Sequence, residues 1–439
     1  MGTAYTSMAM NLATPGQQLA IDPLPRDVDV LVIGGGVIGV TSAWYLAQRG
    51  RTVTLVDKDD VCAGSSYGNS GLLVPSHSRP LAAPGVLAQG LRWLLDSASP
   101  FYVKPRLDRD LLAWLWKFRG ACTAENVRRA VPVLRDLSYA SLALYRELAA
   151  IPGFDFGLRQ DGVLMVFRTK ARLDEHRHEA ETLQAAGISA RVLDENGARE
   201  LEPALRPDIA GAVYFPEDAH LTPDRFVRGL ARLAQERGVT VMPSTEVLGF
   251  ERSGRRIAAI ETTRGAVRAS EVVLAAGSWS PALGRQLGVR LPIQPAKGYS
   301  VTCDAPPGGP RLPMLLGEAR FAVTPMGDAL RFGGTLELAG LDLTINRVRV
   351  DAIQRGWRDY LAVPGELRLR QIWRGLRPCT PDGLPLLGRP RALDNLVVAT
   401  GHAMIGVSLG PITGKLVTEI VAGEKPGVDI AALDPDRFG

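Results

Sequence analysis

Short apolar runs alternate with longer helical stretches along most of the chain, a pattern that predicts strands alternating with helices. The first run, residues 30–33, is continuously apolar, as expected for a parallel strand that is buried on both faces. A helical stretch follows, ends at Gly50 and leads into a second apolar run at residues 53–56. A third run, residues 271–277, ends in Ala-Ala-Gly. We therefore expect an α/β fold in which these runs belong to one parallel sheet.

The rest of the pattern predicts helices that cover a sheet, and further strands with polar interruptions. Helices are predicted at residues 107–118, 124–149, 171–186, 223–238 and about 409–421, with a short helical piece at 93–95. A turn followed by a strand is predicted at residues 161–167. Further strands are predicted at 211–215, 239–242, 246–250, 257–262, 266–269, 292–303, 315–324, 329–338 and 396–399. Pro411 fits the first turn of the last helix and Gly423 its C-terminal cap. The strands between 292 and 338 suit the antiparallel sheet of a second domain.

Composition bounds the class of protein. The chain has 439 residues, which is long for a single core, so two interleaved or consecutive domains are expected. Apolar residues make up 46% and charged residues 22%, as in ordinary soluble globular proteins. The net charge of +5 is carried mainly by scattered arginines. We therefore expect no nucleic-acid partner, since nucleic-acid binding calls for clustered basic residues.

The cysteines and the N-terminus indicate the compartment. The four cysteines are far apart in sequence, which argues against a metal knuckle or a redox pair, and no metal site is predicted. Residues 1–26, a predicted N-terminal arm, lack a basic start followed by an apolar core, so we expect no signal peptide. The prediction is a cytoplasmic protein. Peripheral contact with the inner membrane and the oligomeric state stay open.

The glycines after the first strand form G-x-G-x-x-G, at Gly34, Gly36 and Gly39. The first allows a tight turn, the second lets the backbone approach a pyrophosphate, and the third lets the helix pack close to the strand. The second strand ends at Asp57, at the distance expected of a carboxylate that binds a ribose hydroxyl. A glycine-rich turn without a ligand would leave Asp57 unexplained. We therefore predict a dinucleotide site, with FAD or NAD favoured over NADP by the acidic residue.

Residues 63–73, which follow this strand, are mostly small and hydroxylic. That composition suits a backbone that passes close to a ligand. The alternative is a flexible loop, but its place directly after Asp57 favours contact with the cofactor.

Four segments then occur together in one order. They are the glycine motif at 34–39, the strand at 273–280, an Arg-Pro…Thr-Pro-Asp-Gly loop at 377–383 and a Gly-His…Gly…Pro…Gly segment at 401–414. From about residue 27 onward the chain resembles the FAD-dependent amine oxidoreductase family that includes D-amino acid oxidase, glycine oxidase and sarcosine oxidase. Residues 66–71 and 77–118 are most similar to bacterial D-amino acid dehydrogenases, some of which oxidise cyclic D-amino acids such as D-proline and cis-4-hydroxy-D-proline.

The resemblance implies a Rossmann-like FAD-binding domain interleaved with an antiparallel-sheet substrate domain. On this chain the FAD-binding domain would comprise residues 27–76, 212–288 and 371–439, and the substrate domain residues 77–211 and 289–370. The implied reaction moves a hydride from the α-carbon of a D-amino acid to flavin N5, and water hydrolyses the resulting imino acid. Electrons would then pass to an acceptor such as a quinone or an electron-transfer chain.

The predicted FAD-binding residues lie in the segments named above, with one residue of the strand near 247. They are Gly34, Gly36, Val37, Ile38, Gly39, Asp57, Lys58, Ser65, Ser66, Asn69, Ser70, Gly71, Leu72, Val247, Ala275, Ala276, Gly277, Gly401, His402, Ile405, Gly406, Val407 and Ser408. The turn at 401–408 leads into the last helix, whose N-terminus would stabilise negative charge on the reduced flavin near N1 and O2. Some sarcosine oxidases attach FAD to a cysteine a few residues before Thr-Pro-Asp. Here Cys379 immediately precedes that motif and Gly375 is nearer the attachment position, so we predict non-covalent FAD.

The substrate carboxylate calls for an arginine. Glycine oxidases carry one directly after a proline of the second-domain sheet, whereas here Met326 follows Pro325. Three arginines remain as candidates, and the sequence leaves the choice among them open: Arg320, Arg331 and Arg377. Tyr299 could donate a hydroxyl group to the same carboxylate, or be a half-buried sheet residue. For His402, packing beside the flavin is favoured over acid–base chemistry.

Other functions remain as alternatives. A glycine- or sarcosine-type oxidase would pass electrons to oxygen and release peroxide. A FAD subunit of a larger dehydrogenase complex would depend on partner chains. A tRNA-modifying flavoprotein is disfavoured by the scattered charge, and an NAD-linked dehydrogenase by the motifs outside the glycine turn.

Overall fold

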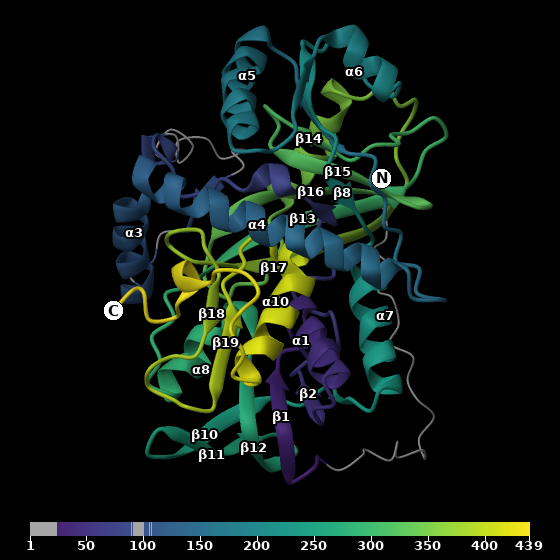
Figure 1. The fold of residues 1–439 in the computed structure, drawn as a ribbon. Helices are drawn as coiled ribbons and strands as arrows, with labels where there is room; N and C mark the ends of the chain where they lie inside the picture. Colours follow the sequence, from purple (N-terminus) through teal and green to yellow (C-terminus); the bar gives the residue numbers. More distant parts are fainter. Residues whose placement is uncertain (1–23, 89, 91–100, 105, 107) are drawn as a thin grey trace.

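The computed structural model describes residues 24–88, 90, 101–104, 106 and 108–439. Its strands form two large sheets, one around β1 (Asp27–Ile33) in the lower half of Figure 1 and one around β16 (Ala329–Leu338) in the upper half. The predicted α/β class, with a parallel sheet and a second, largely antiparallel sheet, is confirmed. The predicted helical piece at 93–95 and residues 1–23 of the predicted N-terminal arm lie outside the described residues.

Parallel strands form the centre of the first sheet. Their order is β19 (Leu396–Thr400), β12 (Gly265–Leu274), β1, β2 (Val53–Val56) and β9 (Thr240–Met242). β18 (Leu386–Gly388) pairs antiparallel with β19, and β10 (Val247–Ser253) and β11 (Arg256–Thr262) extend the sheet antiparallel from β12.

The prediction of separate strands at 266–269 and 271–277 is wrong. Both belong to β12, which pairs with β11 from Gly265 to Val267 and with β1 from Arg268 to Leu274. The chain leaves the sheet after Leu274. Residues 275–277 therefore lie at the carboxyl end of the parallel strands, where open α/β sheets bind ligands.

The second sheet is assembled from three parts of the chain. Its strand order is β17 (Leu369–Cys379), β13 (Gln294–Asp304), β16, β15 (Phe321–Met326), β14 (Met314–Leu316), β5 (Val163–Phe167), β7 (Gly211–Phe215) and β6 (Arg191–Leu193), with β4 (Phe101–Val103) parallel to β16. The strand predicted at 315–324 is in fact two, because residues 317–320 turn the chain between β14 and β15.

Two strands of this sheet extend beyond the segments predicted for the substrate domain. β7 pairs with β5, and β17 pairs with β13 along most of its length. Residues 212–215 and 371–379, which the predicted boundaries place with the FAD-binding part, therefore belong to the second sheet. The predicted loop at 377–383 is likewise a strand as far as Cys379.

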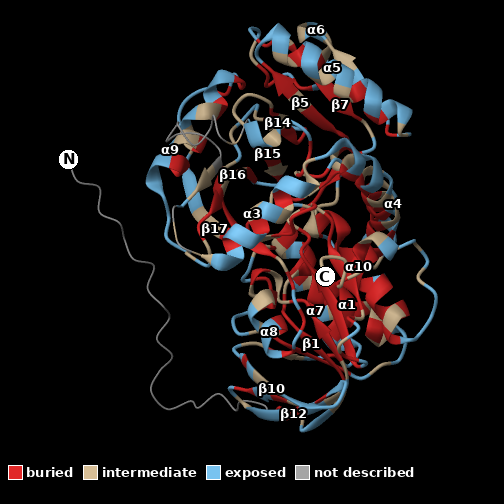
Figure 2. Ribbon diagram, turned by 90° about the vertical axis from the view of Figure 1, so that its left-hand side faces the viewer, coloured by how far each residue is buried: buried red, intermediate tan, exposed pale blue. Residues whose placement is uncertain are grey.

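Helices cover both sheets. α1 (Val37–Gln48) packs on α10 (Gly406–Val421), and both are largely buried in Figure 2. A Cβ atom on Gly414 would lie 2.5 Å from the backbone carbon of Thr41, so glycine is required for this close packing. The long α4 (Ala124–Ala149) runs across the middle of Figure 1 and also packs on α10. The other α-helices of the described residues are α3 (Arg109–Ala121), α5 (Lys170–Ala185), α6 (Glu195–Leu201), α7 (Pro223–Glu236), α8 (Ser280–Gln286) and α9 (Arg347–Gly356).

The last helix begins earlier than predicted, at Gly406, so Pro411 lies inside it rather than in its first turn. Pro411 has no N–H to donate to the carbonyl four residues earlier, that of Val407. The Tyr145 hydroxyl of α4 donates to that carbonyl instead, at 2.5 Å. A side chain of the covering helix thus compensates for the proline.

Replacing Tyr145 with phenylalanine is expected to lower the free energy of unfolding by about 1–3 kcal/mol, because the Val407 carbonyl would be left buried without a donor. Denaturant titration of the FAD-loaded variant would measure the loss. Tyr139→Phe is the matched control, since the hydroxyl of this half-buried α4 tyrosine donates to the exposed side chain of Glu217. Equal stability of the Tyr145 variant and the wild type would contradict this account of the proline.

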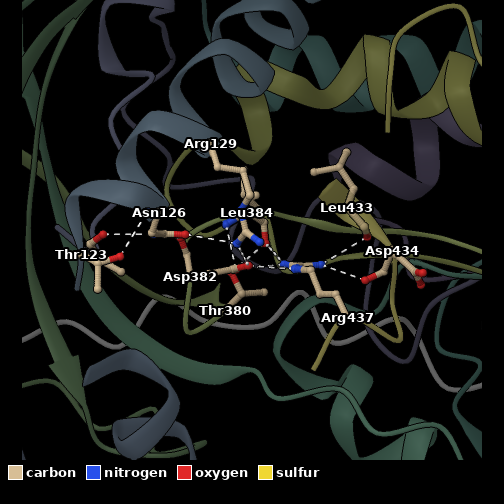
Figure 3. A network of polar contacts seen from close by, with 10 residues as sticks. Thr123, Asn126, Arg129, Thr380, Asp382, Leu384, Leu433, Asp434 and Arg437 are labelled. Carbon is tan, nitrogen blue, oxygen red and sulfur yellow. Dashed lines mark hydrogen bonds and ion pairs between the residues drawn. The ribbon is translucent and has the colours of Figure 1, made fainter. Parts of the chain in front are cut away.

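A polar network fixes the loop after β17 (Figure 3). The carboxylate of Asp382, which is 3% exposed, receives two hydrogen bonds from Arg437, at 2.8 and 2.9 Å. Asn126 of α4 donates to the Asp382 carbonyl at 3.1 Å. Arg437 also donates to the carbonyls of Leu384 and Leu433. The Thr-Pro-Asp-Gly motif therefore joins the second sheet to α4 and to the C-terminal segment.

Candidate cofactor and active site

A cavity opens at the carboxyl ends of β1, β2, β12 and β19. Most of the predicted cofactor residues line it: Gly34, Gly36, Val37, Ile38, Asp57, Lys58, Ser65, Ser66, Asn69, Val247, Ala275, Ala276, Gly277, Gly401, His402, Gly406 and Val407. The other predicted cofactor residues are absent from the lining: Gly39, Ser70, Gly71, Leu72, Ile405 and Ser408. Of these, Gly39 has a packing role, because a Cβ atom there would lie 1.8 Å from the Gly34 carbonyl oxygen.

The glycine turn brings backbone N–H groups to the cavity wall. Gly34 has φ +115°, and a Cβ atom on it would lie 2.5 Å from the Ala275 carbonyl oxygen. Gly36 precedes α1, has ordinary extended backbone and offers no side-chain cap to the helix. The first turn of α1 carries no acidic residue. This N-terminus is therefore a site for an anionic group such as a pyrophosphate.

Asp57 stands beside the turn. Its Oδ2 accepts from the Gly35 N–H at 2.6 Å and its Oδ1 from the Asp59 N–H at 2.8 Å. Burial raises the pKa of this carboxyl group above its ordinary value, although both backbone hydrogen bonds oppose the shift. Next to it, the Lys58 ammonium group lies 4.1 Å from the centre of the Trp279 ring. Trp279 also lines the cavity and was missed in the sequence because it stands beyond the small residues that follow β12.

The small-residue loop after Asp57, residues 65–71, is held in place from several sides. The Ser66 hydroxyl accepts from the Val37 N–H, the first of α1, at 2.9 Å. The hydroxyls of Ser65 and Ser278 both donate to the Leu376 carbonyl of β17. Because β17 belongs to the second sheet, these bonds join that sheet to the cavity loop. The composition of the loop therefore reflects defined contacts and not flexibility.

Arg331, a candidate for binding the substrate carboxylate, holds the same loop. It is 5% exposed, and its Nη1 donates to the carbonyls of Tyr67 and Asn69, both at 3.0 Å. Its Nε donates to the Thr302 hydroxyl at 3.1 Å. Burial lowers the pKa of this guanidinium group. These contacts make Arg331 an anchor for the loop.

The N-terminus of α10 forms the opposite wall of the cavity. Gly406 and Val407 line it, the first turn has no acidic residue, and the helix has no side-chain cap. His402 lies beside it, 3% exposed, with Nε2 3.0 Å from the Thr413 hydroxyl. Burial lowers the pKa of His402 to about 3, so the ring is neutral at physiological pH. A neutral, hydrogen-bonded histidine agrees with the packing role favoured from the sequence.

Arg377 lies on the face of the second sheet that meets the cavity loop. Side chains alternate along β17, which places Trp373, Gly375 and Arg377 on one face. A Cβ atom on Gly68 of the loop would lie 2.0 Å from the Trp373 ring, so this face contacts the loop. The Arg377 guanidinium group donates to the Thr335 carbonyl at 2.6 Å, and burial lowers its pKa. Among the described residues no carboxylate lies within ion-pair distance of it.

Tyr299 and Arg320 lie elsewhere. Tyr299 pairs with Arg374 of β17, which puts it on the sheet face opposite Arg377. Its hydroxyl is 3.2 Å from both carboxylate oxygens of Glu337 and accepts from the Asn346 N–H. Arg320 occupies the turn before β15 with φ +57°, near the charged residues of α5 at the top of Figure 1. The structure therefore brings only Arg331 and Arg377 together near the cavity loop.

Two residues on the Arg377 face were missed in the sequence. Trp373 packs against both the loop and Gly375, where a Cβ atom would lie 1.9 Å from the ring. Thr335 supplies the carbonyl that accepts from Arg377. A strand predicted over 369–379 would have placed Trp373 and Arg377 on one face, because side chains alternate along a strand. The sequence pattern instead predicted a loop from residue 377 onward. Nothing in the sequence pattern marks Thr335.

A buried acid lies behind the loop. Asp218 is 1% exposed, its Oδ1 accepts from the Ser76 N–H at 3.1 Å, and the Ser76 hydroxyl donates to its Oδ2. Burial raises the pKa of Asp218 from 3.8 to about 7. Between these pH values the folded state holds the proton more tightly than the unfolded state.

Stability should therefore fall as the pH rises from about 4 to about 7, by about 1.4 kcal/mol for each pKa unit of the shift at Asp218. Asp218→Asn, which removes the titration, should show a smaller fall. Urea unfolding of wild type and variant at pH 5 and pH 8 measures the difference. An identical pH dependence in the two proteins would show that Asp218 does not titrate in this range.

The lining of the cavity matches the parts of FAD. The glycine turn and the α1 N-terminus fit a pyrophosphate, Asp57 fits a ribose, and the α10 N-terminus fits the electron-rich edge of a flavin. Among the described residues no group of three or more His, Cys, Asp or Glu side chains is placed to hold a metal ion. No described helix is long and apolar enough to span a bilayer.

Comparison with known proteins agrees with this geometry. Residues 29–420 match the model of the DAO family of FAD-dependent oxidoreductases. The chain belongs to this family and is an FAD-dependent oxidoreductase.

Individual relatives cover nearly the whole chain. A D-amino acid dehydrogenase of Methylobacterium nodulans is 36% identical over 93% of this chain and 99% of its own. One of Granulibacter bethesdensis is 34% identical with the same coverage. Among solved structures, glycine oxidase from Geobacillus kaustophilus superposes with a TM-score of 0.77 at 25% identity, covering 94% of this chain and 99% of its own. L-proline dehydrogenase from P. horikoshii gives 0.71 at 21% identity, covering 94% and 98%.

Proposed function

We propose that this protein is a D-amino acid dehydrogenase that binds the substrate carboxylate through Arg377. The observation that carries the proposal is a half-buried guanidinium group on the sheet face that meets the cavity loop, whose acceptors among the described residues are backbone carbonyls. An arginine partly removed from water without an acidic partner is unfavourable, and a bound carboxylate would offset that cost. The relatives named D-amino acid dehydrogenase support the substrate class. Cyclic D-amino acids, including D-proline and cis-4-hydroxy-D-proline, are the proposed preferred substrates.

FAD, when bound, supplies the hydride acceptor for oxidation of the substrate C–N bond. The chain supplies position and charge. Arg377 would hold the substrate carboxylate. The α10 N-terminus would stabilise the negative charge that the flavin carries once it is reduced. His402, which is neutral, would pack beside the cofactor. A substrate amine that binds neutral needs no protein base, so the site is complete without an acid–base pair.

An anaerobic screen of the FAD-loaded protein tests the proposal. D- and L-amino acids, with sarcosine, glycine and the proline and hydroxyproline isomers, would be added separately while the flavin absorbance is followed. Bleaching by D-isomers alone is expected, fastest with the cyclic ones. Bleaching by sarcosine or glycine, or by none of these compounds, would contradict the proposal.

The proposed electron acceptor is a quinone or an electron-transfer chain. With a substrate from the screen, a soluble quinone should be reduced faster than peroxide is released in air. Stoichiometric peroxide release without quinone reduction would instead identify an oxidase. Activity of the isolated chain would count against a subunit that works only inside a larger complex.

The FAD is proposed to be bound without a covalent link. Cys379 is 2% exposed, and burial raises the pKa of its thiol to about 12, so it is a poor nucleophile. Precipitation with trichloroacetic acid should release all the yellow colour into the supernatant. Flavin that stays with the pellet after washing would contradict this prediction.

A further inference from the structure

β16 carries a bulge where it pairs with β13. The register shifts between Lys297 and Tyr299 of β13, so that Gly298 alone lies opposite Thr335 and Leu336 of β16. Bulges of this kind re-aim side chains and recur beside active sites. The extra residue places Thr335 beside Gly298, and the Arg377 guanidinium group lies over Gly298.

The backbone of Thr335 is strained. Its φ is +63°, in the left-handed region that favours glycine and is especially unfavourable for a β-branched residue. Glycine is the usual residue at this place in such a bulge. Because threonine carries a conformational cost here that glycine would avoid, its side chain calls for an explanation.

The bulge sets the position of Arg377. The Thr335 carbonyl accepts from Nη1 at 2.6 Å, and the Gly334 carbonyl is 3.5 Å from Nη2. The guanidinium group lies over Gly298, where a Cβ atom would be 2.2 Å from Nη1. Thr335 and Gly298 therefore hold the arginine flat against the sheet.

The Thr335 hydroxyl is not engaged by the part of the fold that the structure describes. Its Oγ1 is buried and has no hydrogen-bond partner among the described residues. A buried hydroxyl without a partner is unfavourable. A ligand oxygen bound beside Arg377 would supply the missing acceptor.

We propose that Thr335 is a substrate-binding residue, whose hydroxyl donates a hydrogen bond to the same carboxylate that Arg377 holds. This inference rests on the proposed function. Thr335 takes the role of hydroxyl donor to the carboxylate that the sequence suggested for Tyr299. The Tyr299 hydroxyl instead bonds to Glu337 on the opposite face of the sheet.

Three variants of the FAD-loaded protein test the proposal. Thr335→Val keeps the shape and the strain but removes the hydroxyl, Thr335→Ser keeps the hydroxyl, and Thr335→Gly removes both hydroxyl and strain. With a D-amino acid, Thr335→Val should lose about tenfold to a hundredfold in kcat/KM, mainly through KM, since a hydrogen bond to a charged group is lost. Thr335→Ser should stay within about threefold of the wild type.

Two readouts do not depend on turnover. Titration of acetate against the flavin spectrum should give a Kd about tenfold higher in Thr335→Val than in the wild type. Thr335→Gly should melt at or above the wild-type temperature while losing activity as Thr335→Val does. Thr418→Val, at a buried α10 hydroxyl that already donates to the Gly414 carbonyl, is the matched control and should change neither KM nor the acetate Kd.

Wild-type KM and acetate Kd in Thr335→Val or Thr335→Gly would overturn the proposal, and so would a loss in Thr335→Ser equal to that in Thr335→Gly. If Thr335→Val does not fold, the serine and glycine variants decide. Failure of the proposed function looks different, because then no D-amino acid bleaches the flavin of the wild type.

Discussion

Replacing Arg377 with methionine is expected to lower kcat/KM for D-amino acids by about 10²–10⁴-fold. The reason is the loss of two charge-assisted hydrogen bonds, each of which contributes about 1.5–3 kcal/mol. Methionine fills a similar volume, and the recorded acceptors of Arg377 are backbone carbonyls, so the fold should persist. Steady-state kinetics with a quinone or dye acceptor, together with the flavin content per chain, would measure the effect.

Arg374→Met is the matched control. Arg374 is on the same strand but points to the opposite face, where its Nε donates to the Leu343 carbonyl. Its kcat/KM should stay within about threefold of the wild type. If the Arg377 variant kept its flavin and turned over normally, the carboxylate would have to bind elsewhere.

Replacing Gly36 with alanine is expected to abolish FAD binding while leaving the apoprotein folded. A Cβ atom at Gly36 would lie 3.4 Å from the Ser66 hydroxyl oxygen, an ordinary van der Waals contact, and the backbone there is ordinary extended chain. The methyl group therefore fits the protein, but it occupies the space that the pyrophosphate needs. Fluorescence titration of the apoprotein with FAD should show a rise in Kd of at least about a hundredfold.

Gly120→Ala provides the control for this variant. Gly120 lies in α3, and outside its own helical turns no described atom lies within 4 Å of an added Cβ, so FAD affinity should be unchanged. Circular dichroism of both apoproteins should match the wild type. Wild-type FAD affinity in the Gly36 variant would mean that the pyrophosphate does not approach this turn.

The nucleotide half could be predicted from the sequence because its constraints are local. The apolar run of β1, the glycines at fixed spacing and Asp57 at the end of β2 follow one another within 31 residues, from Asp27 to Asp57. Each feature meets its own physical requirement. The β1 run is buried, the glycines allow a positive φ or close packing, and Asp57 accepts hydrogen bonds from backbone N–H groups. Of these residues, Gly34, Gly36 and Asp57 line the cavity.

The substrate half was less predictable because its contacts join distant segments. Nothing near Arg331 indicates that its donors go to Tyr67 and Asn69, more than 250 residues away. Tyr299 and Arg377 were both plausible ligands for a carboxylate, and only the register of β13 with β17 separates them onto opposite faces. Pro411 was misplaced because a side chain of α4 supplies the bond that the proline cannot.

The most direct test of the account is anaerobic rapid mixing of the FAD-loaded protein with the two enantiomers of one amino acid, proline, in the wild type and in Arg377→Met. The account predicts that D-proline bleaches the wild-type flavin and L-proline does not, and that the variant bleaches at least a hundredfold more slowly at the same D-proline concentration. Equal bleaching by the two enantiomers, or an unchanged rate in the variant, would contradict it.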